Sequence, residues 1–268
     1  MEVQFLNCGV LRPRGAKVFV PQMTAAPCLC LLIRDGDGAI LVDSGFGTRD
    51  MEDPTRLGFS NHLLNMDEDE ADTAFSQVRK LGIRTEEVRH IICTHLDRDH
   101  AGGLSDFPDA SVHVTRLERA AALARETSKE RNRYRPAHFE HGVNWVTYEA
   151  GSDEKWFGLE CIRVLEGLPP EIVLVPLPGH TRGHCGVAVD TGDGWLLHCG
   201  DTYYCGEELE YRKAPAGIRA FRRLAHMDFS QAMTQLAAVR KIARDEGSVE
   251  LIASHDAAEC EKRLGRKP

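Results

Sequence analysis

Short apolar runs that end in polar turns alternate with stretches of helical spacing along the chain. The runs 28–33 and 39–42 are joined by Asp-Gly-Asp-Gly, which favours a hairpin because glycine adopts positive φ without a steric penalty. Thr-Gly-Asp-Gly joins 185–190 to 195–199 and predicts a second hairpin. The same pattern predicts further strands that begin near Ile91 and at 111–114, 161–165, 171–177 and 250–253.

Helical spacing of apolar residues separates several of these strands. Over residues 71–81 the spacing stops at Gly82, and a glycine in that place is typical of a helix C-terminus. Thr115 to Glu118 have the pattern of a capping box and predict the start of an alanine-rich helix. Two more helices are predicted at 218–224 and 230–243, the second with inward-facing Met233, Leu236, Val239 and Ile242.

The segment 127–158 has no clear period and concentrates arginine, histidine and aromatic residues. We predict that it forms a substrate wall or a lid. The alternative is an ordinary surface excursion whose aromatic side chains pack inward. His138 and His141 could resemble a pair of metal ligands, but no apolar stripe would hold them on one face of a helix.

Length, composition and charge favour one globular domain over residues 1–268. Of the 268 residues, 42% are hydrophobic and 28% are charged, and no linker or repeat divides the chain. The net charge of −8 comes from interspersed acidic and basic residues, whereas a nucleic-acid binder presents a basic face. No apolar run is long enough to span a bilayer, and the N-terminus lacks the features of a signal peptide. We therefore expect a cytoplasmic protein that binds a small molecule rather than nucleic acid or a membrane.

Nine cysteines raise the question of disulfides or a metal site. The number is odd, the chain is long, and several cysteines lie in apolar runs, which favours free buried thiols. Cys28 and Cys30 are alternate residues of a predicted strand with no second pair of metal spacing nearby. We assign no cysteine to chemistry.

Aspartate and histidine residues follow the ends of five predicted strands. Four candidate ligands lie within six residues after the strand near Ile91: His95, Asp97, Asp99 and His100. The other strand ends are followed by Asp43, His180, Asp201 and His255. Any one of these histidines alone would more often be a core or surface residue, and Asp43 has the alternative of capping a turn. Together, imidazole and carboxylate groups at five strand ends predict a site for divalent cations.

In order and spacing, these residues resemble the metallo-β-lactamase-fold superfamily, whose pattern is a His-x-His-x-Asp-His loop followed by three more ligands at later strand ends. The resemblance covers nearly the whole chain. It implies an α/β (α+β) fold, a four-layer αββα sandwich of two mixed β-sheets flanked by helices. It also implies that one metal ion is held by His95, Asp97 and His180, that a second is held by Asp99, His100 and His255, and that Asp201 bridges them. Asp43 and Asp256 are expected to orient the ligands from behind.

The chain departs from this pattern at Asp97, where most members of the superfamily have histidine. A carboxylate adds one negative charge to the first metal site. We therefore expect two divalent ions, zinc foremost, with Mn²⁺ or Fe²⁺ also plausible beside Asp97. The alternative is that Asp97 points away and the first site is weak or empty.

The resemblance implies a metal-dependent hydrolase in which a hydroxide shared by the two ions attacks a carbonyl. No Gly-x-Ser-x-Gly elbow, P-loop or Gly-x-Gly-x-x-Gly after a strand offers another chemistry. Asp99 is the candidate to carry a proton to the leaving group. Tyr204 follows Asp201 by three residues, as a substrate-facing tyrosine does in the similar acyl-homoserine-lactone lactonases, although it could equally be a packing residue. We predict a lactone or related carboxylic ester as substrate; the alternatives are a thioester, a β-lactam or a phosphodiester, and less readily a redox or non-catalytic role.

Overall fold

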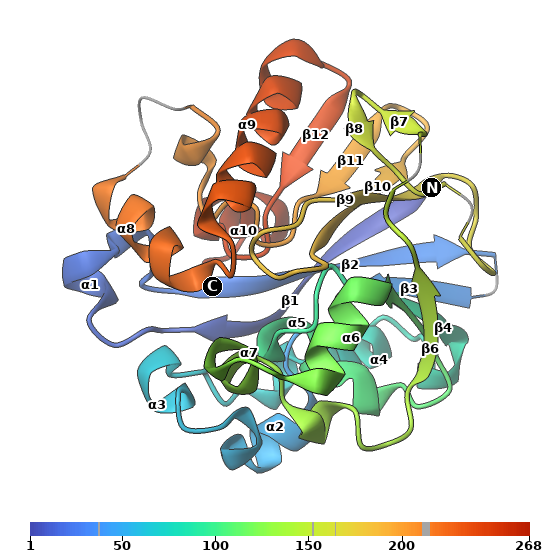
Figure 1. Ribbon diagram of the computed structural model, residues 1–268. Helices are drawn as coiled ribbons and strands as arrows, with labels where there is room; N and C mark the ends of the chain where they lie inside the picture. The colour runs from blue at the N-terminus through green and yellow to red at the C-terminus, as the bar shows by residue number, and fades with distance from the viewer. Residues whose placement is uncertain (37, 152, 164, 211–214) are drawn as a thin grey trace.

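Two mixed β-sheets form the centre of the protein, and helices lie on their outer sides (Figure 1). The structure is a computed structural model that describes residues 1–36, 38–151, 153–163, 165–210 and 215–268. The N-terminal part of the chain builds one sheet and the C-terminal part builds the other.

The first sheet has six strands in the order of the chain: β1 (Glu2–Leu11), β2 (Ala26–Asp35), β3 (Gly38–Val42), β4 (Val88–Ile92), β5 (Ser111–Thr115) and β6 (Asn144–Tyr148). The first three strands are antiparallel, and β3 to β6 are parallel. Asp35 pairs with Gly38, which confirms the first predicted hairpin. Asp37, which was predicted to lie in its turn, is outside the described residues.

The second sheet has four strands in the order β12 (Val249–Ile252), β11 (Trp195–His198), β10 (Cys185–Asp190) and β9 (Ile172–Pro176). Asp190 pairs with Trp195, which confirms the second hairpin. The strand predicted at 161–165 is reduced to an isolated bridge between Ile162 and Leu174, and Val164 lies outside the described residues. A separate pair, β7 (Lys155–Trp156) and β8 (Leu159–Glu160), precedes this sheet.

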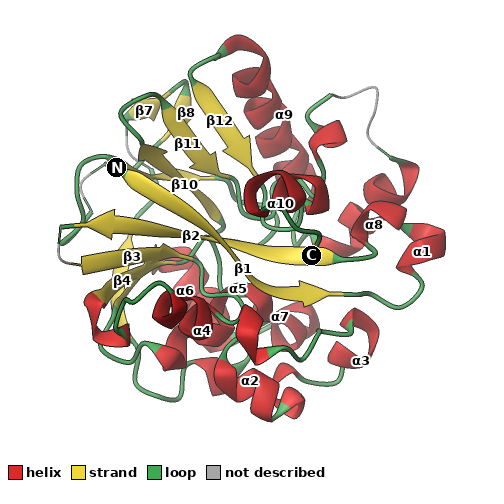
Figure 2. Cartoon of the chain, turned by 180° about the vertical axis from the view of Figure 1, so that it is seen from behind, coloured by secondary structure: helices red, strands yellow, loops and turns green. Residues whose placement is uncertain are grey.

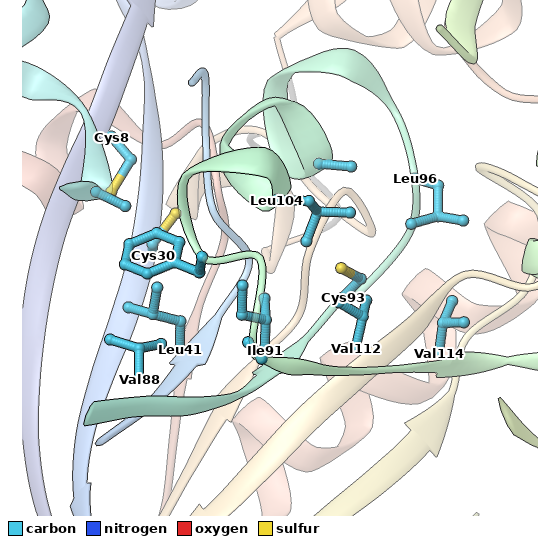
Figure 3. Packing of buried hydrophobic residues seen from close by; sticks show 14 of the residues in the cluster. Cys8, Cys30, Leu41, Val88, Ile91, Cys93, Leu96, Leu104, Val112 and Val114 are labelled. Carbon is cyan, nitrogen blue, oxygen red and sulfur yellow. The ribbon is translucent and has the colours of Figure 1, made fainter. Parts of the chain in front are cut away.

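Three apolar layers separate the sheets and the helices. Alternate residues of β2 show why its sequence is continuously apolar: Leu31 and Ile33 pack between the two sheets, whereas Cys30 and Leu32 pack on the outer side. On that side they meet α4 (Ala74–Lys80) and α6 (Arg116–Ala124), and Figure 3 shows part of this layer around Cys30 and Leu41. On the far side, α9 (Phe229–Asp245) covers the second sheet. This arrangement confirms the predicted four-layer sandwich.

The remaining α-helices are α1 (Ala16–Phe19), α2 (Thr48–Glu52), α3 (Asn61–Leu64), α5 (Arg98–Ala101), α7 (Ser128–Arg133), α8 (Ala216–Ala225) and α10 (Ala257–Leu264). Figure 2 shows α10 close to the long strands β1 and β2. The helix predicted over 71–81 is interrupted, because Thr73 ends a 3₁₀ turn (Glu70–Asp72) and caps α4 by accepting a hydrogen bond from the Ser76 amide at 3.2 Å. None of the described helices combines the length and apolarity that crossing a bilayer requires.

The segment 127–158 contains more regular structure than its sequence indicated. It forms α7 at its start and contributes β6 to the first sheet. Several of its aromatic side chains do pack inward, among them the fully buried Tyr134 and the partly buried Phe139 and Trp145. The C-terminal end of α7 reaches the candidate site described below.

His113 of β5 should make the protein sensitive to acid. Its Nε2 lies 2.9 Å from Nδ1 of His90 and its Nδ1 lies 2.8 Å from the Tyr148 hydroxyl, and burial lowers its pKa to about 4. The unfolded chain binds a proton near pH 6.5, so the stability from the neutral ring is present above that pH and is lost as the pH falls toward 4. Between pH 7 and pH 5 the wild type should lose about 2 kcal/mol more stability than His113→Gln, measured by urea unfolding.

The control for this experiment is His62→Gln on the exposed face of α3, which should follow the wild type at both pH values. Equal losses in the wild type and His113→Gln would show that His113 does not contribute to the acid sensitivity.

Candidate metal centre

The predicted ligands meet where strands of both sheets end at one edge. Asp43 follows β3 and the His95 loop follows β4, both from the first sheet. His180 follows β9, Asp201 follows β11 and His255 follows β12, all from the second sheet. A hydrogen bond from the Cys185 amide to the Thr94 carbonyl, 2.9 Å long, joins the two sheets beside the ligand loop.

The first ligand set consists of His95, Asp97 and His180. Oδ2 of Asp97 lies 3.5 Å from Nε2 of His95 and 3.1 Å from Nε2 of His180. The ring centroids of the two histidines are 4.8 Å apart. One donor atom from each of the three residues lies within 4.8 Å of the others, which is close enough to surround one cation. Asp97 thus faces the first set and does not point away from it.

The second ligand set consists of Asp99, His100 and His255. Oδ2 of Asp99 lies 3.4 Å from Nε2 of His255 and 4.0 Å from Nε2 of His100. Asp201 lies between the two sets: its Oδ1 is 3.4 Å from His100 and 3.3 Å from His255, whereas its Oδ2 is 3.4 Å from His180. Its two oxygens therefore face different sets.

Hydrogen bonds donated by Nδ1 turn the Nε2 atoms of three candidate ligand histidines toward the centre. His100 donates to Oδ2 of Asp43 at 2.9 Å, and His255 donates to the Pro27 carbonyl at 2.7 Å. Nδ1 of His95 lies 3.0 Å from the hydroxyl of Thr94, which itself donates to Asp43 at 2.8 Å. Asp43, which has a positive φ of 57°, thus contacts His100 directly and His95 through Thr94.

The inner donor atoms lack protein partners of their own. Among the described residues, Nε2 of His95, Nε2 of His100, Oδ1 of Asp97 and Oδ1 of Asp201 are buried without a hydrogen bond. Buried polar atoms are normally satisfied, so four such atoms facing one centre indicate a missing partner. A mixture of imidazole and carboxylate donors fits divalent metal ions such as Zn²⁺.

The charges within the centre reinforce one another. Burial alone would raise the pKa of the Asp201 carboxyl, but His255, His180 and His100 together lower it well below its usual range. Burial also opposes the charged form of His100, yet Asp43 and Asp201 raise its pKa well above 6.5. His180 differs, because burial dominates and lowers its pKa to about 4. A neutral His180 keeps a lone pair for a ligand.

Comparison with known families agrees with this arrangement. Residues 23–255 match the model of the metallo-β-lactamase superfamily. The chain belongs to that superfamily. It is 39% identical over 259 residues to a "Probable metallo-hydrolase" of Mycobacterium tuberculosis, covering 96% of this chain and 80% of that protein. It is 25% identical over 204 residues to an N-acyl homoserine lactonase of Bacillus cereus, covering 72% of this chain and 70% of the lactonase.

The fold comparison extends over almost the whole chain. A variant of AiiA from B. thuringiensis, with N-decanoyl-L-homoserine bound at its active site, superposes with a TM-score of 0.74. The match covers 97% of this chain and 95% of that one at 21% identity. This likeness confirms the metallo-β-lactamase fold.

Tyr204 contacts a candidate ligand, whereas Asp256 caps a helix. The Tyr204 side chain is buried, and its hydroxyl lies 3.3 Å from Nδ1 of His180, the ring nitrogen that faces away from Asp97. The Asp256 carboxylate accepts hydrogen bonds from the amides of Ala258 and Glu259, at 2.9 and 3.2 Å, and so caps α10. No contact with a ligand side chain is found among these hydrogen bonds, so an orienting role for Asp256 would act through the start of α10.

Sequence patterns did not assign Glu118 or His184 to the site. Glu118 is fully buried and accepts hydrogen bonds from the Leu96 amide at 3.0 Å and the Gly183 amide at 3.1 Å, which ties the His95 loop to the His180 loop. The predicted capping box is therefore only half formed: Thr115 caps α6, but Glu118 turns to the site. His184 accepts the Asp201 amide at 2.9 Å. His184 is the last residue of the segment Pro-Gly-His-Thr-x-Gly-His at 178–184, and this position could have indicated that it lies near the site.

All nine cysteines are buried and free, as predicted. One of them nevertheless borders the centre, because the Cys28 thiol lies within 4.8 Å of donor atoms of both Asp99 and His255. The spacing of Cys28 and Cys30 gave no indication of this, since the strand that carries Cys28 meets His255 only in the folded protein.

A buried ion pair between Glu208 and Arg222 supports the Tyr204 loop. Oε1 of Glu208 accepts the Tyr204 amide at 2.6 Å, and Oε2 pairs with Arg222 of α8. Arg222→Met removes the arginine that pairs with this buried carboxylate and should lower stability by about 3–5 kcal/mol. Glu208→Gln combined with Arg222→Met keeps the acceptor for Tyr204 without the charge and should recover most of that loss in urea unfolding. A double variant as unstable as Arg222→Met would contradict this account.

Proposed function

We propose that this metallo-hydrolase of the metallo-β-lactamase superfamily cleaves a lactone or a related carboxylic ester with two divalent metal ions, zinc foremost. The position of Asp201 carries the proposal, because its two oxygens face different ligand sets and suit a bridge between two ions. The B. cereus lactonase relative supports the choice of a lactone.

The metal ions would be held by His95, Asp97 and His180 on one side and by Asp99, His100 and His255 on the other. When bound, such a pair supplies a Lewis acid for the carbonyl oxygen and lowers the pKa of a bound water. Manganese or iron remains an option at the first set, because Asp97 contributes an oxygen donor there.

The side chains around these sets supply the remaining functions. Asp99 is the most exposed of the three central carboxylates, with 14% of its side chain accessible, and it would carry a proton to the leaving group. The Tyr204 hydroxyl, beside His180, would donate a hydrogen bond to the substrate oxygen. The C-terminal end of α7, from the segment 127–158, would form one wall of the site.

The proposal is tested by metal analysis of the purified protein together with a hydrolysis screen. Metal-loaded protein is assayed with lactones, aryl esters, thioesters, β-lactams and phosphodiesters, and a His255→Ala variant serves as control. We expect turnover of lactones or aryl esters that depends on metal and is lost in the variant. Turnover confined to thioesters, β-lactams or phosphodiesters would reject the ester assignment. A protein that takes up no metal when it is supplied with metal ions would reject the whole proposal.

A further inference from the structure

Arg133, the last residue of α7, reaches into the first ligand set. Its Nη1 donates to Oδ2 of Asp97 at 2.7 Å and lies 3.1 Å from Nε2 of His180. Its Nη2 donates to the Ala225 carbonyl at the end of α8. Only 13% of the side chain is exposed, so the guanidinium is an enclosed part of the site.

The contact with His180 has a chemical consequence. Nε2 of an imidazole has a single lone pair, which accepts a hydrogen bond or binds a metal ion but not both. Nδ1 of His180 offers no substitute, because it faces His226 at 3.2 Å and Tyr204 at 3.3 Å. A metal ion therefore binds His180 only after Arg133 has withdrawn from it.

In the part of the chain that the structure describes, no lysine or arginine is hydrogen-bonded or ion-paired to the second ligand set. Nε2 of His100 is buried without a hydrogen-bond partner among the described residues. Nε2 of His255 faces the carboxylates of Asp99 and Asp201 at 3.4 and 3.3 Å. A cation that enters here replaces a proton and not a cationic side chain, and the two carboxylates attract it.

Arg133 also balances the charge that distinguishes this chain from the superfamily pattern. Asp97 adds a negative charge where most members have a neutral histidine, and the guanidinium at 2.7 Å offsets it. Since Arg133 and Asp97 form a charge-assisted pair, a metal ion entering the first set must compete for Asp97 as well as for His180.

The helix that carries Arg133 is held in place from several directions. A capping box between Thr127 and Glu130 begins α7, with hydrogen bonds of 3.1 and 2.8 Å. Lys129 donates to the His226 carbonyl at 2.9 Å, and Arg98 of α5 donates to the Asn132 carbonyl. Arg133 is thus positioned by its helix and is not a flexible surface side chain that reaches the site by accident.

We propose that Arg133 is a built-in cation of the first ligand set that imposes an order on metal binding. The second set fills first, and the first set fills with lower affinity because Arg133 must leave His180 and share Asp97. The inference rests on the two-metal site of the proposed function.

The test is a titration of metal-free protein with Zn²⁺. Binding is measured by calorimetry, and the number of bound ions is measured by native mass spectrometry. In the wild type, the first ion should bind at least roughly tenfold more tightly than the second. In Arg133→Gln, the second ion should bind at least roughly tenfold more tightly than it does in the wild type. Arg131→Gln is the matched control, because Arg131 lies on the same helix and its hydrogen bonds stay within residues 125–131 on the exposed side. It should reproduce the wild-type titration.

Two results would overturn the inference and leave the metal pair of the proposed function intact: equal affinities for both ions in the wild type, or an unchanged second affinity in Arg133→Gln. If neither protein takes up a second ion, the two-metal centre itself is wrong. Should Arg133→Gln not fold, Arg133→Lys provides the second measurement. Its single amine cannot hold both Asp97 and the Ala225 carbonyl, so the second ion should again bind more tightly, by a smaller factor.

Discussion

Asp201→Ala is expected to abolish turnover, whereas Tyr204→Phe should keep measurable activity. Asp201 is the residue whose two oxygens face both ligand sets, so its removal separates the sets and leaves His100, His180 and His255 without their shared carboxylate. Tyr204→Phe removes at most one hydrogen bond to the substrate, which costs roughly 10²–10³ in rate. The measurements are kcat/KM with the substrate found in the screen and metal content per chain.

The control for both variants is Asp190→Ala, a carboxylate at the opposite end of β10 that caps the Thr-Gly-Asp-Gly turn. It should keep full metal content and activity. If Tyr204→Phe proved as inactive as Asp201→Ala, one of the two residues would have a different role from the one proposed.

Removal of metal should lower thermal stability by a large amount. Without metal the centre holds buried imidazole and carboxylate atoms that lack partners, and a ligand that binds only the folded state adds about 4 kcal/mol at a thousand times its Kd. For a chain of this size each kcal/mol shifts Tm by roughly 2–4 °C, so chelation should lower Tm by roughly 8–16 °C relative to zinc-loaded protein.

A double variant, His95→Ala with His255→Ala, lacks one ligand from each set and provides the comparison. Its Tm should be nearly the same with and without zinc. A wild-type Tm that does not respond to chelation, in protein shown to be free of metal, would contradict a metal centre that contributes to the folded state.

The residues of the candidate centre could be grouped from the sequence because strand ends are well marked. Buried strands such as β3 and β11 have continuous apolar sequences that end at polar residues. In this fold the residues that follow these strand ends line the candidate site. His180, Asp201 and His255 each follow a predicted strand, which was enough to group them, although β10 and β11 separate the first two and α8 and α9 lie between the last two. The sandwich itself followed from the resemblance of these ligands to a known family and not from hydrophobic periodicity.

The two edge strands of the first sheet, β1 and β6, were missed for a physical reason. An edge strand is covered on fewer sides, so its residues need not be apolar. The residues of β6 are all intermediate or exposed, and so are the first four residues of β1, whereas the last six residues of β1 are buried. A polar sequence such as Asn-Trp-Val-Thr-Tyr therefore gives little hydrophobic signal.

Arg133 could not be predicted for a different reason. It lies on a short polar helix of six residues, and nothing in that helix indicates which arginine side chain points toward a loop that precedes it by more than thirty residues. Contacts of this kind depend on how α7 docks against α5 and α8, which only the folded structure shows.

The division of the ligands between the two sheets sets the time at which the centre can form during synthesis of the protein. His95, Asp97, Asp99 and His100 belong to the half of the chain that leaves the ribosome first, yet each ligand set also needs a histidine from the later half. When the loop that carries His95 to His100 emerges, the histidines that complete each ligand set have not yet been synthesised. In the proposed two-metal centre, stable loading of either ion would therefore have to wait until the second sheet has closed on the first. For the set that contains His255, it would have to wait until β12 has been made.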